Sequence, residues 1–137
     1  MVAAVGQGPS ANLITPVNNS TVVPNTSINL AATAIAAGGT ISSVQFYQNG
    51  SPVGNPITSP PYTSSFVPTL PGSYVFDAIA TDDRGNTKVS NSSTVTAAFG
   101  TPTIAITSPK ADVTKPNNAV RVTPNIPLTI SATATAG

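Results

Sequence analysis

The chain contains no cysteine, no histidine and no glutamate among its 137 residues. Without cysteine there can be no disulfide and no thiolate nucleophile or ligand, and without histidine there is no imidazole base or metal ligand. Hydroxyl groups are plentiful, but the sequence offers no base that would activate one of them. These absences predict that the chain is not an enzyme.

Charge is also scarce, because charged residues make up 7% of the chain and the net charge is +1. The basic residues are scattered rather than clustered, which argues against binding to nucleic acid. They are Arg84, Lys88, Lys110, Lys115 and Arg121. No apolar run approaches the roughly 20 residues of a membrane span. The hydrophobic fraction of 39% is enough for a modest core, so a folded domain is expected.

Two segments return later in the chain after about 93 to 100 residues. The segment Ala3–Pro16 resembles Ala97–Pro109, and Ser27–Gly39 resembles Pro127–Gly137. Such self-similarity is the mark of a repeat protein.

The repeats predict a division of the chain into three parts. Residues 1–10 are expected to be the tail of a preceding repeat or a linker, so that Met1 need not be a natural start. Residues 11–100 would form a complete domain, and residues 101–137 the N-terminal part of a second one.

Apolar and polar residues alternate along the chain, with turn-forming residues every 8 to 12 positions or so, which is typical of an all-β sandwich or barrel. About seven strands are predicted in the complete repeat: Leu13–Ile14, Ser27–Ala36, Ile41–Gln48, Ser51–Gly54, Tyr62–Val67, Ser73–Thr81 and Ser92–Phe99. Val22 and Val23 could pair briefly as well. Asn49-Gly50 predicts a tight type I′ hairpin, because these residues tolerate positive φ. The predicted core is Leu30, Val44, Phe46, Tyr74, Phe76 and Val95, with Phe99 also facing inward.

Several stretches together resemble bacterial immunoglobulin-like (Big-type) repeat domains of extracellular and surface proteins. They are "LITPVNNSTV", "INLAATA", "ISSVQFYQNGSPVG", "PPYTSSF" and "GSYVFDAIATDDRGN". The resemblance implies a Greek-key sandwich of antiparallel strands. Because the chain has neither the intersheet disulfide nor the core tryptophan of antibody domains, apolar packing must hold the two sheets together.

The resemblance also implies a function without catalysis. Relatives of this kind serve as spacers, stalks or filament-forming units at the cell surface or outside the cell, with neighbouring repeats as their partners. The alternatives are an adhesive or glycan-binding module, and an accessory domain of a secreted enzyme or of a virion. Residues 126–136 could further pair with another chain by strand addition, giving a homo-assembly.

One turn is a weak candidate for a metal site. Asp82, Asp83 and Asn86 supply oxygen atoms of the kind that Ca²⁺ binds. The alternative is a turn in which these side chains cap the backbone and Gly85 takes positive φ. No other cofactor is expected. Sequons for N-glycosylation begin at Asn18, Asn19, Asn25, Asn49 and Asn91.

Overall fold

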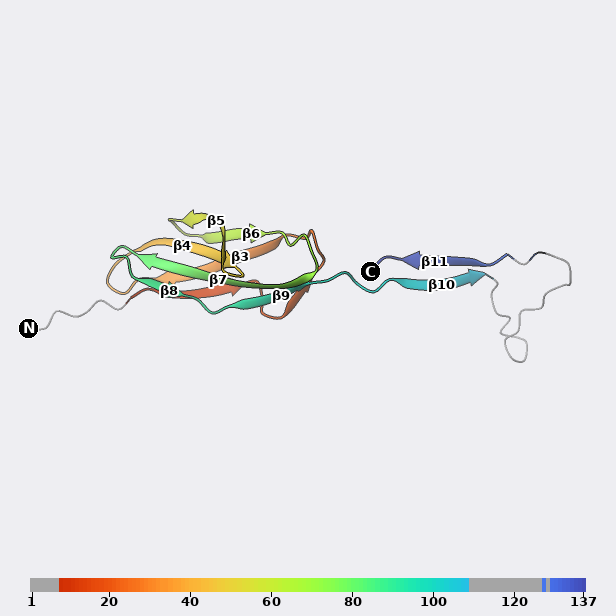
Figure 1. Ribbon diagram of the computed structural model, residues 1–137. Helices are drawn as coiled ribbons and strands as arrows, with labels where there is room; N and C mark the ends of the chain where they lie inside the picture. The colour runs from red at the N-terminus through yellow and green to blue at the C-terminus, as the bar shows by residue number, and fades with distance from the viewer. Residues whose placement is uncertain (1–7, 109–126, 128) are drawn as a thin grey trace, which may run out of the picture. The chain divides into compact units, whose positions relative to one another are not determined.

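The computed structural model describes residues 8–108, 127 and 129–137, and the chain divides into two compact units. Unit 1 ends at Phe99 and unit 2 begins at Gly100. All regular elements in the described residues are β-strands (Figure 1). No helix among these residues is long and apolar enough to cross a membrane. The predicted all-β class is therefore confirmed.

Unit 1 is a sandwich of two sheets. The small sheet has the order β1-β3-β6 and consists of β1 (Ser10–Thr15), β3 (Ile28–Ile35) and β6 (Tyr62–Phe66). The large sheet has the order β2-β9-β7-β4-β5, with β8 also paired to β7. Its strands are β2 (Ser20–Val22), β4 (Ile41–Gln48), β5 (Ser51–Ile57), β7 (Gly72–Asp82), β8 (Thr87–Val89) and β9 (Ser93–Ala97).

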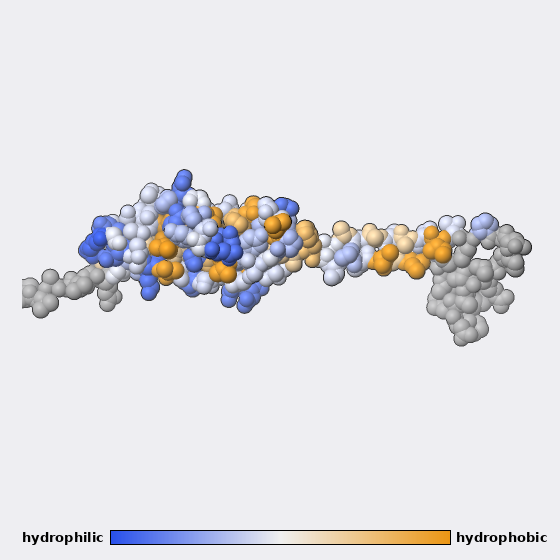
Figure 2. Space-filling view, in the orientation of Figure 1, coloured by the Kyte–Doolittle hydropathy of each residue, from blue (hydrophilic) through white to orange (hydrophobic). Residues whose placement is uncertain are grey.

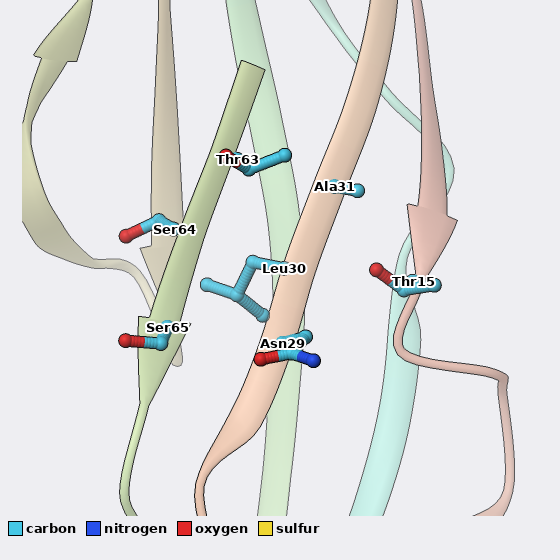
Figure 3. Close-up of a pocket in the computed structure, with 7 residues that line it drawn as sticks. All are labelled: Thr15, Asn29, Leu30, Ala31, Thr63, Ser64 and Ser65. Carbon is cyan, nitrogen blue, oxygen red and sulfur yellow. The ribbon is translucent and has the colours of Figure 1, made fainter. Parts of the chain in front are cut away.

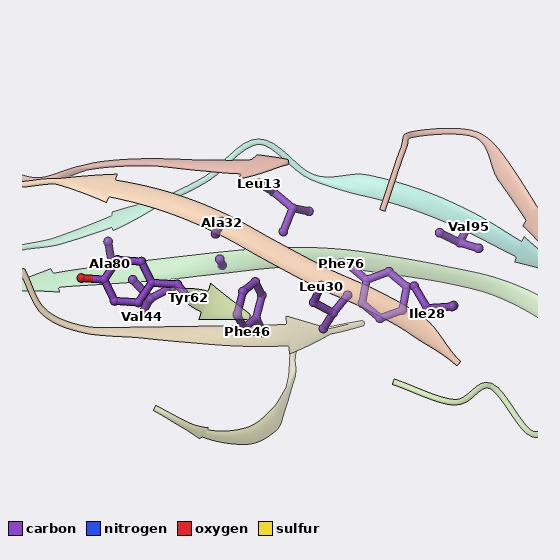
Figure 4. Close-up of a cluster of buried hydrophobic side chains, with 11 residues drawn as sticks. Leu13, Ile28, Leu30, Ala32, Val44, Phe46, Tyr62, Phe76, Ala80 and Val95 are labelled. Carbon is purple, nitrogen blue, oxygen red and sulfur yellow. The ribbon is translucent and has the colours of Figure 1, made fainter. Parts of the chain in front are cut away.

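The core lies between these two sheets, because each sheet turns every second side chain toward the other. On β3 the inward residues Ile28, Leu30 and Ala32 are buried, while Asn29 between them is exposed. Figure 4 shows this row facing the aromatic rings of the opposite sheet. The full buried cluster is Leu13, Ile28, Leu30, Ala32, Val44, Phe46, Tyr62, Phe76, Ala78, Ala80 and Val95.

Aromatic rings add directional contacts to this burial. The ring of Phe66 in the small sheet meets that of Phe76 in the large sheet edge to face, with centroids 5.5 Å apart. Such a pair contributes about 0.5–1.5 kcal/mol beyond the area it buries. Phe46 and Phe76 are almost completely buried, as predicted, but Tyr74 is only partly buried. Its hydroxyl reaches the surface and donates a hydrogen bond to the carbonyl of Leu70 at 2.8 Å.

The hairpin between β4 and β5 follows the expected turn chemistry. Asn49 has φ of 47° and Gly50 has φ of 81°, so both central residues lie in the left-handed region. β4 spans Ile41–Gln48, the bounds predicted from the sequence.

Three details differ from the sequence-based expectation. The three-residue strand β8 was not expected, and together with the equally short β2, where brief pairing at Val22 was expected, it brings the count in unit 1 to nine. The strands β2 and β9 pair in parallel, so the sandwich is not purely antiparallel. Phe99, expected inside, is 61% exposed because β9 ends at Ala97 and the chain has already left the sheet.

Unit 2 contains one antiparallel pair, β10 (Thr103–Ser108) with β11 (Ser131–Thr135). Its register repeats that of β1 with β3: Leu13 lies opposite Ala32, and Ile106 lies opposite Ala132. Both pairs also carry an irregularity at the same place, just after Leu13 and just after Ile106. Part of the segment 126–136, expected to add to another chain, lies outside the described residues.

We predict that Phe76→Ala lowers the free energy of unfolding of unit 1 by roughly 3–5 kcal/mol, because it opens a cavity between the two sheets. Urea unfolding of the full chain measures this change. The matched control is Val75→Ala on the outward face of the same strand, where the side chain is 37% exposed, and it should cost far less. Equal losses for the two variants would contradict the assigned inward face.

Candidate functional site

The turn between β7 and β8 is built around the carboxylate of Asp82. Asp82 is the last residue of β7 and its side chain is 3% exposed. Its Oδ1 accepts hydrogen bonds from the backbone N–H groups of Arg84 at 2.9 Å and Asn86 at 2.8 Å. Its Oδ2 accepts a third from Nδ2 of Asn86 at 2.9 Å. Gly85, with φ of 82°, lets the chain reverse between them.

These hydrogen bonds favour the charged form of the carboxylate. They hold the pKa of Asp82 below its ordinary value of 3.8, with the side-chain amide of Asn86 as the largest cause. The backbone N–H groups and the positive charge of Arg84 lower it further, while desolvation opposes them. Asp77, on the same strand, shows the opposite case, because burial raises its pKa.

The structure brings Asp82 and Asn86 together, but in the manner of a backbone cap. Asn86 turns its amide N–H toward the carboxylate, so it offers Asp82 a donor rather than a second oxygen ligand. Asp83 is exposed, and its backbone N–H donates to the carbonyl of Thr40 at 3.0 Å. Within the described residues, no group of three Asp, Glu, His or Cys side chains is placed to hold a metal ion. Calcium binding by Asp82, Asp83 and Asn86 stays an untested prediction, and the geometry favours the structural role.

Asn91 forms a link between the two sheets that the sequence did not reveal. It lies in the short segment between β8 and β9. Its Oδ1 accepts a hydrogen bond from the backbone N–H of Leu13 at 2.9 Å, and its Nδ2 donates to the carbonyl of Leu13 at 3.2 Å. The side-chain amide thus serves one residue of the β1 edge as a neighbouring strand would.

Two more side chains form hydrogen bonds at the point where the chain crosses from the small sheet to the large one. Ser93 donates from its hydroxyl to the carbonyl of Pro16 at 2.7 Å, and Asn18 accepts from the backbone N–H of Thr94 at 2.8 Å. In the sequence, Asn18 and Asn91 stood out only as sequons. Their structural role depends on contacts across more than 70 positions, which no local pattern encodes.

A shallow groove of about 620 Å³ lies on the small sheet, where β1 ends (Figure 3). Its lining is uncharged and consists of Thr15, Asn29, Leu30, Ala31, Thr63, Ser64 and Ser65. Among the described residues, Thr15 Oγ1 is a buried side-chain atom without a hydrogen-bond partner in the protein. The lining residues include no aromatic ring on which a sugar could stack.

We predict that Asn91→Ala lowers the free energy of unfolding by about 1 kcal/mol, because both backbone groups of Leu13 lose their partner. The effect stays near the low end of the usual range since Asn91 is exposed and water can replace it. Thermal or urea unfolding measures the change, with exposed Ser92→Ala as the neighbouring control. Asn91→Asp keeps the acceptor for the N–H of Leu13 but loses the donor to its carbonyl. Its loss of stability should therefore lie between those of Asn91→Ala and Ser92→Ala. If Asn91→Ala left the free energy of unfolding unchanged, the link would not stabilise the fold.

We predict that Asp82 makes unit 1 sensitive to acid. Its pKa is lower in the folded state, so its contribution is complete above about pH 3.8 and is lost as the pH falls through the folded value. The stability difference between the wild type and Asp82→Asn should therefore shrink in acid, and this comparison cancels the opposite contribution of Asp77. Asn86→Ala, which removes the main cause of the shift, should weaken the effect. A difference that stays constant from pH 6 to pH 2 would contradict the assignment.

Comparison with known proteins identifies the fold. A family profile described as bacterial Ig domain matches residues 9–97. Among solved structures, the fibronectin(III)-like modules of Clostridium thermocellum CbhA are similar, with 26% identity and a TM-score of 0.60. That match covers 93% of this chain, which spans 63% of the length of the CbhA chain.

A second similar structure is the PKD1 domain of Vibrio anguillarum Epp, at 20% identity and a TM-score of 0.49 over 67% of this chain and 95% of that one. No curated protein sequence matches significantly. The profile match covers most of the chain and the whole sandwich of unit 1. The chain therefore belongs to the bacterial Ig domain family.

Proposed function

We propose that this chain is a non-catalytic spacer module of an extracellular or cell-surface protein built from tandem Ig-like domains. Its role is mechanical, because each sandwich is a separately folded domain and a series of such domains lengthens the protein. Neighbouring repeats of the same polypeptide are its partners.

The observation that carries this proposal is the repeated register of two strand pairs. β10 pairs with β11 as β1 pairs with β3, with the same opposed positions and the irregularity at the same place. Residues of β10 are numbered 93 above their counterparts in β1, and those of β11 are 100 above those in β3. Since β1 and β3 open the sandwich of unit 1, β10 and β11 are suited to open another.

Two further observations support the proposal. The match to the CbhA modules covers 93% of the chain, although unit 1 ends at Phe99, so the likeness includes part of unit 2. The chain also lacks the histidine, cysteine and glutamate side chains on which most catalytic and metal sites depend.

The pairing of β2 with β9 suits a module that bears tension. β2 lies near the start of unit 1 and β9 at its end, and the two strands run in parallel. A pull on the two ends of the chain would drive these strands past each other, so that their hydrogen bonds share the load. The pair is extended by Asn19 N–H donating to the carbonyl of Thr94 at 2.8 Å and by Ala98 N–H donating to that of Val22 at 2.9 Å.

The alternative with a structural feature behind it is binding of a neutral glycan in the groove at Thr15, Asn29 and Thr63. Its uncharged hydroxyl and amide lining suits such a ligand. We favour the spacer because carbohydrate sites commonly use an aromatic platform, and this lining has none.

Single-molecule stretching of the full chain from its two ends tests the spacer function. We expect unit 1 to unfold in one cooperative step, at a force that falls in Asn18→Ala because the side-chain acceptor for Thr94 N–H is lost. The matched control is Asn55→Ala on the edge strand β5, where the side chain is exposed, and it should leave the force unchanged.

Equal forces for Asn18→Ala and Asn55→Ala would contradict the load-bearing role of the β2–β9 pair. Saturable binding of a neutral glycan, abolished by Asn29→Ala, would instead favour the binding module. Stabilisation by Ca²⁺ that a chelator reverses would point to a metal-dependent role at Asp82.

A further inference from the structure

The β10–β11 pair has one apolar face. Ile104 and Ile106 alternate on β10, and the residues opposite them on β11 are Ala134 and Ala132. Ile130, just before β11, continues this row. The three isoleucines are 75%, 72% and 69% exposed, and Figure 2 shows the hydrophobic surface along this pair of strands.

The other face of the pair is largely polar, with Thr103, Thr133 and Thr135 among its residues. An isolated pair of strands is at best marginally stable in water unless further strands or a packed layer support it. The exposed isoleucine row therefore marks the side on which a covering layer would stabilise the β10–β11 pair.

Unit 1 shows which layer fits such a face. By the shared register, Ile106 corresponds to Leu13, and Ile130 corresponds to Leu30. In unit 1 these leucines are 5% and 0% exposed. They pack in one cluster with side chains of the large sheet, among them Val44 on β4, Phe76 on β7 and Val95 on β9.

We propose that the isoleucine face of β10–β11 is a docking surface for a sheet of the β4–β7–β9 type, supplied by polypeptide that follows β11 as β4 follows β3. This inference rests on the proposed tandem arrangement, and it identifies the isoleucine face as the surface that the second unit must bury. The free side of β11 would take a strand equivalent to β6, since β6 pairs with β3 on that side.

One position sets a condition on the covering sheet. Ile104 corresponds to Ala11, which packs at the margin of the unit 1 core. The larger side chain needs more room, so the natural covering sheet should carry a smaller residue opposite Ile104 than unit 1 has opposite Ala11.

A second copy of the chain is the competing occupant. Residues 100–108 and 129–137 contain no charged side chain, so nothing in these stretches repels another strand edge. The shared register favours a covering sheet from the same polypeptide, because β10 and β11 match β1 and β3, which the large sheet of their own unit covers.

A chimera tests the proposal directly. Gly137 corresponds to Ala37, so a second copy of residues 38–99 is joined directly after Gly137 of the full chain. Amide hydrogen exchange is read at β10 and β11, whose sequences occur only once in the chimera. We expect protection there to rise at least ~100-fold over the 137-residue chain, with a second cooperative unfolding transition.

Two variants of the chimera serve as matched arms. Ile106→Asp should abolish the new protection and the second transition while unit 1 unfolds as before. Ile104→Ala should keep or raise the protection, because it relieves crowding against the borrowed sheet.

Three results would overturn the proposal. The chimera could leave β10 and β11 unprotected, which would show that the face does not fit such a sheet. The 137-residue chain could be monomeric by light scattering and already protected there, so that no cover is needed. It could also form a dimer that Ile106→Asp dissociates, which would make a second copy the occupant. The stretching experiment tests the β2–β9 pair of unit 1. Failure of the proposed spacer function would therefore be detected separately from failure of this docking proposal.

Discussion

Burial of one apolar layer between the two sheets is the interaction on which unit 1 depends. The chain has no cysteine, so no disulfide can restrict the unfolded state, and charged residues are few. Leu30, Val44 and Phe76 are completely buried, and Phe46 almost completely. At about 25 cal/mol per Å² of apolar surface removed from water, such side chains are the main source of stability that the sequence provides.

Polar side chains do the complementary work of satisfying the backbone where the strands end or change sheet. Asp82 caps the turn after β7, Asn91 pairs with the β1 edge, and Ser93 and Asn18 hold the crossover from β1 to β2. These four polar side chains are used within the fold, where they replace backbone partners that the strands do not supply.

Much of the fold could be predicted because the relevant signals are local. Alternation of apolar residues gave β4 its bounds and identified Leu30 and Phe76 as core, and Asn49-Gly50 gave the hairpin turn. β8 was missed because its three residues are all exposed and show no alternation. The parallel β2–β9 pair and the role of Asn91 depend on residues more than 70 positions apart, so no local pattern could predict them. Alternation predicts that Phe99 faces inward, but it does not indicate where a strand ends, and β9 ends at Ala97.

The most direct test of the central claim is native-state amide hydrogen exchange of the full chain, resolved residue by residue. If the apolar layer holds the two sheets together, the slowest amides should lie in β3, β4 and β7, which carry its largest buried side chains, and should exchange through one global unfolding step. Slowest exchange in the edge strand β5, or uniformly weak protection in both sheets, would contradict the account.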